Sequence, residues 1–322
     1  MKTALICGVS GQDGSYLAKF LGEKGYRVVG TSRDAQVSTF ANLHRLGIFE
    51  QVEKESMVLT DFRSALQTLT KIKPNEVYNL AGQTSVGLSF QQPVEAMESI
   101  SIGTLNLLES IRFLNKDIRL YNASSSECFG DTGDTPADEN TLFRPRSPYA
   151  VAKAAAHWAT INYRDSYGLF AVNGILFNHE SPLRPQRFVT KKIIEGALQI
   201  RAGKQQKLCL GKLDIQRDWG WAPEYVEAMW RMLQLPKAED FVIATGVTHS
   251  LKDFVDAAFR EVGLNWQDHV EFDDSLTRPS DILISRANAT KARASLAWKA
   301  TISMPQVVQL MMAAERETYV KA

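Results

Sequence analysis

The sequence predicts an α/β fold: a Rossmann-type doubly wound parallel sheet, followed by a smaller mixed α/β domain. Through the first half, short apolar segments alternate with longer segments whose apolar residues repeat at helical spacing, which is the pattern of βαβ units. A glycine-rich turn, Gly8-Val-Ser-Gly11-Gln-Asp-Gly14, separates the first such pair. After about Leu176 the alternation becomes irregular. We therefore expect one domain over residues 1–176 and a second over residues 177–322, with some strand exchange back into the first.

Each element of the first domain has its own signal. Buried strands are expected over six short apolar segments, residues 3–7, 27–31, 56–59, 76–80, 119–123 and 170–177. Helices are expected over four periodic segments, residues 15–24, 62–72, 93–115 and 147–167. In the second half, residues 241–245 are predicted to form a strand, and a Ser250-x-x-Asp253 capping box opens a helix over residues 251–262. This second domain should lie over the carboxyl ends of the sheet, where open α/β folds bind ligands.

Composition excludes several classes of protein. With 37 basic and 36 acidic residues among 322, no overall charge attracts the chain to nucleic acid or to a membrane. Three separated cysteines, Cys7, Cys128 and Cys209, do not form a disulfide framework and favour a reducing compartment. The N-terminal residues lack a signal-peptide pattern, and no stretch of roughly 18 apolar residues could span a bilayer. We expect a soluble cytoplasmic protein.

The glycine turn indicates a dinucleotide site. Gly8 permits a tight turn, Gly11 a close approach of the backbone to a pyrophosphate, and Gly14 close packing of the helix on the strand. A purely structural turn is the alternative, because the spacing is G-x-x-G-x-x-G rather than G-x-G-x-x-G. The second strand is followed by Arg33, which favours the 2′-phosphate of NADP over NAD. Asp34, directly beside it, is the alternative contact to an NAD ribose.

Two further motifs predict the chemistry. Tyr149 and Lys153 are four residues apart on a predicted helix, so they share a face. The lysine is expected to lower the pKa of the tyrosine, which makes it a usable base, and to hold the nicotinamide ribose. Ser125 and Glu127 end a strand, and extended geometry would direct both to one side. A carboxylate there adds an acid/base group to a hydride-transfer site, which allows the elimination of water. The alternatives are an unrelated surface Tyr/Lys pair and a solvated or helix-capping Glu127.

Together these residues resemble GDP-mannose 4,6-dehydratases, members of the extended short-chain dehydrogenase/reductase superfamily. The resemblance covers essentially the whole chain. It is carried by GQDGSYLAKFL, VYNLAGQTSVGLSF, SSSECFG, RPRSPYAVAK, NGILFNHESP, FVTKKI, RDWGWAPEYVEAMW, DFVIATGVTHS and RPSDI. The FNHESP and RDWG blocks are the most specific of these.

The resemblance implies a three-step cycle on GDP-mannose with NADP and no metal. Tyr149 takes the C4 hydroxyl proton while hydride leaves C4, and Glu127 then removes the C5 proton. Water departs from C6 with help from Ser125 and Glu127, and hydride returns to C6. The order is required chemically, because elimination is β to a carbonyl that oxidation must first create.

The resemblance also implies the binding residues. The implied cofactor contacts are Gly8, Gly11, Gln12, Asp13, Gly14, Arg33, Leu80, Tyr149, Lys153, His179 and Arg184. The implied substrate contacts are Ser85, Asn178, Glu180, Val189, Lys192, Arg217, Arg278 and Asp281. Within this set Lys192 matches a lysine near guanine and ribose. Arg217 and Arg278 match a diphosphate clamp, a role that suits the planar fork of arginine.

Several positions depart from the family pattern and leave alternatives open. Ser125 stands where a threonine is usual, and Val58-Leu59 replaces an Asp-Leu pair near adenine. Ser85 replaces a histidine near the sugar, so a related substrate such as a GDP-heptose stays open. Asp34 replaces a second arginine, and the altered loop AQVSTF follows it, so both a homodimer and a homotetramer are expected possibilities.

Two other functions compete with a dehydratase. An NADP-dependent GDP-sugar epimerase or reductase is disfavoured because it needs no carboxylate at Glu127. A non-catalytic NADP-binding subunit is disfavoured because it needs none of the four residues Ser125, Glu127, Tyr149 and Lys153.

Overall fold

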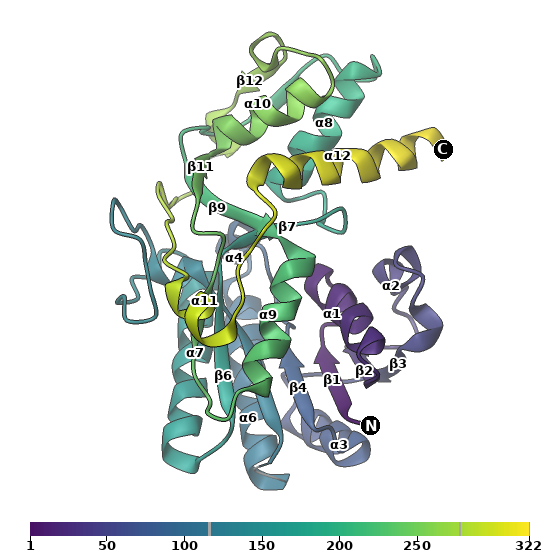
Figure 1. The fold of residues 1–322 in the computed structure, drawn as a ribbon, viewed down its shortest axis with the longest axis vertical. Helices are drawn as coiled ribbons and strands as arrows, with labels where there is room; N and C mark the ends of the chain where they lie inside the picture. The colour runs from purple at the N-terminus through teal and green to yellow at the C-terminus, as the bar shows by residue number, and fades with distance from the viewer. Residues whose placement is uncertain (115–116, 277, 322) are drawn as a thin grey trace.

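The chain is built on a seven-stranded sheet in the computed structural model, which describes residues 1–114, 117–276 and 278–321 (Figure 1). The strand order is β10-β6-β5-β4-β1-β2-β3, and every pair is parallel. The strands are β1 (Thr3–Cys7), β2 (Arg27–Ser32), β3 (Glu53–Ser56), β4 (Glu76–Asn79), β5 (Arg119–Ser125), β6 (Ala171–Leu176) and β10 (Phe241–Ile243). From β1 the chain builds outward to β3 and then returns to β4 on the other side of β1. This reversal between β1 and β4 is the topological switch point at which such sheets bind ligands.

Helices cover both faces of this sheet, so the doubly wound α/β prediction is confirmed. On one face α1 (Gln12–Glu23) packs against α9 (Ala222–Gln234). On the other face lie α3 (Phe62–Ile72), α6 (Gly103–Leu114) and α7 (Pro148–Tyr167). Apolar side chains fill both interfaces, with Leu17 and Met229 in one core and Leu69 and Leu107 in the other.

Segments from the second half of the chain contribute to both layers. Strand β10 pairs with β6, and α9 covers α1, so part of the sequence after residue 176 completes the first sheet. The remainder forms a smaller layer above it (Figure 1). That layer holds β7 (Asn178–Glu180), β8 (Leu208–Leu210), β9 (Gln216–Trp221), β11 (Thr248–Ser250), β12 (Val270–Phe272), α8 (Val189–Arg201), α10 (Leu251–Glu261) and α12 (Met304–Lys321).

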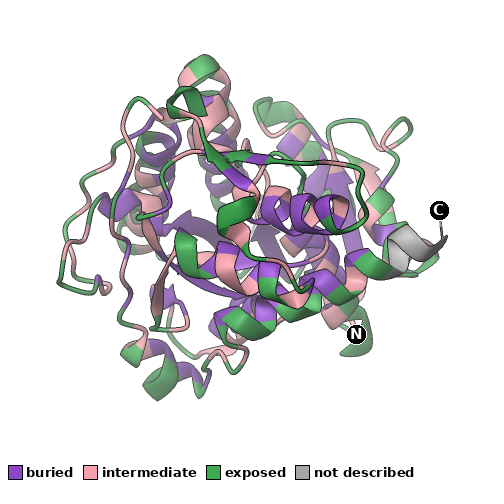
Figure 2. Cartoon of the chain, turned by 90° about the horizontal axis from the view of Figure 1, so that it is seen from above, coloured by how far each residue is buried: buried purple, intermediate pink, exposed green. Residues whose placement is uncertain are grey.

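The second layer has a core of its own. Ile193, Phe254, Phe259 and Met311 are fully buried there and join α8, α10 and α12. The predicted capping box is present, because Asp253 N–H donates to the Ser250 hydroxyl and the Asp253 carboxylate accepts from the Ser250 backbone. Seen from above, buried residues occupy the middle of the molecule and exposed residues its loops (Figure 2).

Several predicted elements have other bounds in the structure, and β3 and β6 are two of them. Strand β3 begins three residues before the predicted segment 56–59 and shares only Ser56 with it. Its position is set by parallel pairing with β2 from Val29 to Ser32. The apolar residues that suggested the strand follow its end, where Met57 is buried and Val58 is exposed. Strand β6 is one residue shorter at each end than the predicted strand over residues 170–177.

The expected single helix over 93–115 is divided. It consists of α5 (Pro93–Ala96), a π-helical segment (Met97–Ile102) and α6, and Asn115 lies outside the described residues. Within this stretch Ser99 accepts a hydrogen bond from the backbone N–H of Gln83 at 3.2 Å. The wide turn therefore contacts the loop that follows β4, and π-helical segments often lie next to functional sites. Two short helices, α2 (Ala41–Arg45) and α4 (Val86–Gln91), were not predicted.

No helix in the part of the chain that the structure describes is long and apolar enough to cross a membrane.

Candidate functional site

The predicted site residues gather at the carboxyl edge of the sheet. The glycine turn (residues 8–14) follows β1, Leu80 follows β4, Ser125 ends β5 and Asn178 begins β7 just after β6. Parallel strands bring these ends to one edge. The second layer lies over the same edge (Figure 1).

The glycine turn has the geometry that the sequence predicts. Gly8 has a φ of 82°, and a Cβ there would lie 3.0 Å from backbone atoms of Leu80 and Ala81. A Cβ on Gly14 would lie 2.3 Å from the carbonyl oxygen of Gly8, so only glycine allows α1 to pack this closely. Gly11 is the N-cap of α1 and supplies no side chain to cap it. The first N–H groups of α1 are therefore free to bind an anion.

Arg33 and Asp34 follow β2 at the same edge. The Arg33 side chain is 84% exposed, and its Nη1 lies 4.0 Å from Oε1 of Glu95. Asp34 Oδ1 accepts a hydrogen bond from the backbone N–H of Gln36 at 2.9 Å. The carboxylate thus shapes its own loop, while the guanidinium is available to a ligand.

Three of the four candidate catalytic residues meet at the end of β5. Tyr149 and Lys153 lie on α7, whose first turn is capped by Ser147, and both are buried. Lys153 Nζ donates to the carbonyl oxygen of Ala123 at 2.7 Å and lies 5.8 Å from the centre of the Tyr149 ring. The Ser125 side chain lies close enough to the Tyr149 phenol to lower the pKa of Tyr149.

The pKa of Tyr149 is raised rather than lowered, contrary to the expectation for a tyrosine beside Lys153. Burial causes the rise, and the nearby Ser125 side chain opposes it only in part. Burial also lowers the pKa of Lys153 to about 8. Removal from water is thus the largest influence on the pKa of both side chains. Within this site, Tyr149 needs a further positive charge, or a partner for its phenolate, before it can act as a base.

Glu127 is reached by a turn rather than by extended backbone, so that expectation is also corrected. The strand ends at Ser125, and residues Ser126–Phe129 form one 3-10 turn. Ser125 Oγ accepts a hydrogen bond from the backbone N–H of Glu127 at 3.2 Å, which begins this turn. The turn places the carboxyl close enough to Tyr149 to influence its pKa electrostatically.

The predicted diphosphate clamp lies beside this carboxyl. Arg217, on β9, and Arg278 both interact electrostatically with Glu127. Oδ1 of Asp281 lies 3.7 Å from Nη2 of Arg217 and 3.9 Å from Nη1 of Arg278. Burial raises the pKa of Glu127, and the two arginines offset this without cancelling it. The site thus pairs a partly buried carboxyl of raised pKa with two cations.

The remaining predicted contacts divide into two groups. Glu180 is buried and accepts from Arg184 Nε at 2.7 Å and from Thr190 Oγ1 at 2.8 Å. Ser85 caps α4, because its hydroxyl accepts from the backbone N–H of Leu88 at 3.2 Å. These side chains have structural partners within the chain. The half-buried Asn178, Val189 and Lys192 lie on β7 and on the first turn of α8, at the base of the second layer.

Gln12, Asp13 and His179 also bond to one another rather than pointing away from the protein. Gln12 Nε2 donates to the carbonyl oxygen of His179 at 3.2 Å, and His179 Nε2 lies 2.9 Å from Oδ2 of Asp13. The Ser181 hydroxyl donates to Gln12 Oε1 at 2.7 Å. The first turn of α1 is therefore tied directly to the segment that leads into the second layer.

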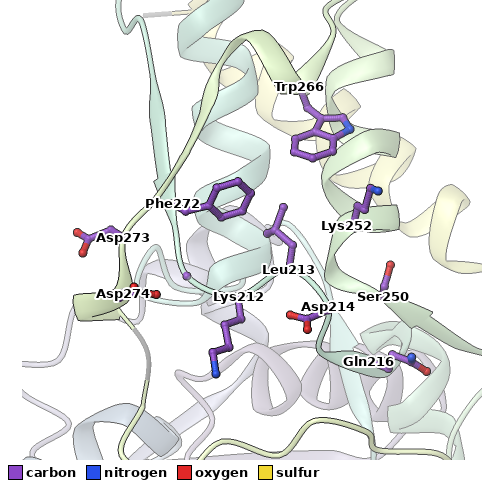
Figure 3. Close-up of a pocket in the computed structure, with 11 residues that line it drawn as sticks. Lys212, Leu213, Asp214, Gln216, Ser250, Lys252, Trp266, Phe272, Asp273 and Asp274 are labelled. Atoms are coloured by element: carbon purple, nitrogen blue, oxygen red, sulfur yellow. The ribbon is translucent and has the colours of Figure 1, made fainter.

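Sequence reasoning missed a hollow of about 610 Å³ in the second layer (Figure 3). Trp266 and Phe272 lie on one side of it, and Lys212, Asp214 and Gln216 line its lower part. One of its lining residues, Gln216, directly precedes Arg217 in β9. The polar residues immediately before the RDWG block were the signal that could have indicated it. A smaller hollow of about 290 Å³ is lined by Lys192 and Glu195.

Comparison with known proteins gives one consistent result. A family model described as GDP-mannose 4,6 dehydratase matches residues 5–311. GDP-mannose 4,6 dehydratase 1 of Arabidopsis thaliana is 46% identical over an alignment of 321 positions that covers 97% of this chain and 89% of that protein. The GDP-mannose 4,6-dehydratase of Vibrio cholerae is 41% identical, covering 98% of this chain and 94% of that protein. The human GDP-mannose 4,6 dehydratase is 40% identical, covering 98% and 91%.

Solved structures with lower sequence identity share the fold. The dTDP-glucose 4,6-dehydratase of Bacillus anthracis, in complex with NAD, has a TM-score of 0.86 at 19% identity and covers 99% of this chain and 98% of that one. RMD from Pseudomonas aeruginosa, complexed with NADPH, has a TM-score of 0.81 at 20% identity, with the same two coverages.

Proposed function

Because the chain belongs to the GDP-mannose 4,6-dehydratase family, we propose that it converts GDP-D-mannose to GDP-4-keto-6-deoxy-D-mannose. The reaction moves a hydride from C4 to C6 and releases water. The observation that supports it best is the position of Glu127, a carboxyl of raised pKa beside Ser125 and Tyr149. A simple sugar-nucleotide epimerase or reductase has no use for this group.

A nicotinamide dinucleotide fits the residues at the carboxyl edge. Gly11 has no Cβ to obstruct a pyrophosphate, and the end of α1, which no side chain caps, offers N–H groups to it. Bound there, the dinucleotide would accept the hydride from C4 and return it to C6. Lys153, buried one turn from Tyr149, would hold its nicotinamide ribose, and Leu80 and Arg184 would border it.

We further propose that the cofactor is NADP. The Arg33 guanidinium is exposed, whereas the Asp34 carboxylate is bonded within its own loop. An arginine at the end of the second strand suits a 2′-phosphate. Cofactor released from the purified protein by denaturation should therefore be NADP, as measured by chromatography. Recovery of NAD alone would show that Asp34, and not Arg33, makes the ribose contact.

The protein side of the mechanism follows from the positions of four residues. Tyr149 takes the C4 hydroxyl proton, and the ketone formed at C4 acidifies the proton on C5. Glu127 removes that C5 proton and then protonates the C6 hydroxyl, which leaves as water, while Ser125 hydrogen-bonds the substrate. After hydride has reached C6, Glu127 passes a proton from solvent to C5, and Tyr149 releases to solvent the proton that it took from the C4 hydroxyl. Arg217 and Arg278 would hold the diphosphate, and Lys192 would lie near the base, so that the hexose lies against Glu127.

One incubation tests the proposal. Purified protein with its bound cofactor is mixed with GDP-mannose without added reductant, and the products are followed by NMR. We expect a 4-keto-6-deoxy sugar, with one deuterium at C5 in deuterated water and the deuterium of C4-labelled substrate retained at C6. A C4 epimer, or no turnover, would contradict the assignment. Turnover of a GDP-heptose but not of GDP-mannose would favour the related substrate that Ser85 leaves open.

A further inference from the structure

His179 has an unusual pair of partners. It is buried in β7, and its Nδ1 lies 2.7 Å from the carbonyl oxygen of Phe177 while its Nε2 lies 2.9 Å from Oδ2 of Asp13. A carbonyl oxygen can only accept a hydrogen bond, and so can an ionised carboxylate. Burial alone would raise the pKa of Asp13, but the attraction and hydrogen bond of His179 and the attraction of Arg184 lower it to about 2. Each ring nitrogen thus lies within hydrogen-bond distance of an oxygen that accepts, which is the arrangement of an imidazolium beside a carboxylate.

The place of this pair makes its charge important. Asp13 is in the first turn of α1, the helix whose uncapped N-terminus would receive the cofactor pyrophosphate. A carboxylate there competes with phosphate for the positive end of the helix and repels it directly. The Asp13 side chain is nevertheless needed, because Asp13 and Gln12 together bond the glycine turn to β7. A positively charged partner for Asp13 keeps this bond to β7 and reduces the repulsion between the carboxylate and the phosphate.

No other acid in the described part of the chain makes an ion pair with the His179 ring. From α9, Tyr225 stacks on the ring with centroids 4.5 Å apart. Glu180, the neighbour in sequence, is occupied by Arg184 and Thr190. Arg184 also donates to the carbonyl oxygen of His179, so a second cation lies on the same side. Asp13 is thus the carboxylate that pairs with the His179 ring.

We propose that His179 is a charge-compensating residue for cofactor binding. Its imidazolium cancels the charge of Asp13, so that the end of α1 presents a positive potential to the diphosphate of the dinucleotide. The inference rests on the proposed function only in requiring a dinucleotide at the glycine turn. It requires nothing of the sugar substrate or of the dehydration.

The test is a double-substitution cycle on NADPH binding. Protein freed of cofactor is titrated with NADPH, and binding is followed by NADPH fluorescence. His179→Asn retains a donor for the Phe177 carbonyl but removes the ion-pair partner of Asp13, which keeps only the hydrogen bond from Gln12 at 3.1 Å and the attraction of Arg184. NADPH should therefore bind at least about tenfold more weakly, the effect of one nearby charge that has lost its ion-pair partner. Adding Asp13→Asn removes that charge. The double variant should therefore bind at least about tenfold more tightly than His179→Asn alone.

Three further measurements separate charge from structure. The deficit of His179→Asn should shrink in high salt, because salt screens the repulsion. The loss of affinity in His179→Asn should be the same for NADH as for NADPH, because both cofactors carry the diphosphate. This comparison makes the result independent of any contact between Arg33 and the 2′-phosphate. His157→Asn is the matched control, another buried histidine whose Nδ1 is bonded, to Ser124 Oγ at 3.1 Å. It should lower the melting temperature without a tenfold change in NADPH affinity.

Two outcomes would overturn the proposal. Native affinity in His179→Asn would show that the charge of Asp13 does not matter. Equal weakness of His179→Asn and of the double variant would show that His179 acts only by shaping the turn. Neither outcome depends on turnover, so a failure of the dehydratase assignment would be seen separately in the GDP-mannose assay.

Discussion

Glu127 and Tyr149 are the two groups whose proton affinity controls the proposed chemistry, and burial raises the pKa of each. For Glu127 this is useful, because a carboxyl of raised pKa is a stronger base toward the C5 proton and, once protonated, can deliver a proton to the leaving hydroxyl. For Tyr149 the raised pKa opposes formation of the phenolate that would accept the C4 hydroxyl proton. The positive nicotinamide ring of an oxidised cofactor would supply the missing stabilisation of the phenolate.

Glu127→Gln should separate the two halves of the reaction. The glutamine keeps the size of the side chain but not its proton transfer, whereas oxidation at C4 depends on Tyr149 and Lys153. In a single turnover with GDP-mannose, the variant should accumulate reduced-cofactor absorbance and a 4-keto intermediate, while the native enzyme shows neither. Glu127→Asp, which retains a carboxyl on a shorter side chain, is the control and should regain part of the product. Formation of 6-deoxy product by Glu127→Gln at the native rate would falsify the role of this carboxyl.

Tyr149→Phe should prevent the first step. The ring still fills its buried place on α7, but the C4 hydroxyl loses its base, so the rate should fall by about 10²–10⁴, the usual scale for one acid/base group. The measurement is reduced-cofactor formation in a single turnover, which should be slowed as much as product formation. An unchanged melting temperature checks that the fold is intact. Near-native turnover would mean that another group accepts the proton.

At the scale of elements, the contact between β5 and α7 positions the catalytic groups. Lys153 donates to Ala123, and one turn further along α7 His157 Nδ1 lies 3.1 Å from the hydroxyl of Ser124. These two contacts hold the last residues of the strand, just before Ser125, against the helix that carries Tyr149. Burial lowers the pKa of His157 to about 4, so the ring is neutral here and makes this contact as an uncharged group.

This contact predicts acid sensitivity. His157 binds protons more weakly in the folded state than in the unfolded chain, so its contribution to stability is present above about pH 6.5 and is lost as the pH falls toward 4. Between pH 7 and pH 5 the native protein should lose about 2 kcal/mol through this residue. His157→Asn should lack that loss, as measured by denaturant unfolding at both pH values. An equal change in the variant and the native protein would show that His157 does not cause it.

Asp218 changes stability with pH in the opposite direction to His157, so its contribution has to be separated from that of His157. Burial raises the pKa of Asp218 to about 6, although the backbone N–H groups of Thr245 and Gly246 donate to its carboxylate. A raised carboxyl pKa means that stability falls as the pH rises from about 4 to 6. Because Asp218 is present in both proteins, its effect cancels when the variant is compared with the native chain.

For the whole molecule, the two layers are held together by contacts that converge on the ligand edge of the sheet. Gln12 and Asp13 bond to β7, and Asp218 on β9 holds the backbone after β10. Arg217, the neighbour of Asp218, is carried with β9 to the side of Glu127. Packing of the second layer on the first therefore assembles the site.

The surface of the molecule predicts self-association. Leu105 and Phe113 on α6 and Val151 and Trp158 on the adjacent α7 are exposed apolar side chains, and apolar patches of this kind mark interaction surfaces. We expect a homo-oligomer in analytical ultracentrifugation. Val151→Glu with Trp158→Glu, seven residues apart on one face of α7, should shift it toward monomer. Val247→Glu, a change of an exposed residue in the loop between β10 and β11, is the control and should leave the association unchanged. A native protein that sediments as a monomer would contradict this prediction.

The sequence by itself determined the features that depend on residues close together in the chain. Strand and helix alternation, the glycine turn and the shared helix face of Tyr149 and Lys153 all follow from local spacing, because backbone sterics and helical periodicity act over a few residues. The element predictions failed where pairing partners decided the register, as in β3, or where a helix widened against a loop, as at residues 97–102.

Only the tertiary structure decided how the site works. Glu127, Arg217 and Asp281 are far apart in sequence, and no local pattern shows that they form one charged cluster. Nor could the sequence show that Asp13 faces His179 across the first turn of α1. The direction of each pKa shift depends on how far packing removes a group from water and on which charges then lie beside it. Both quantities exist only once distant segments have come together.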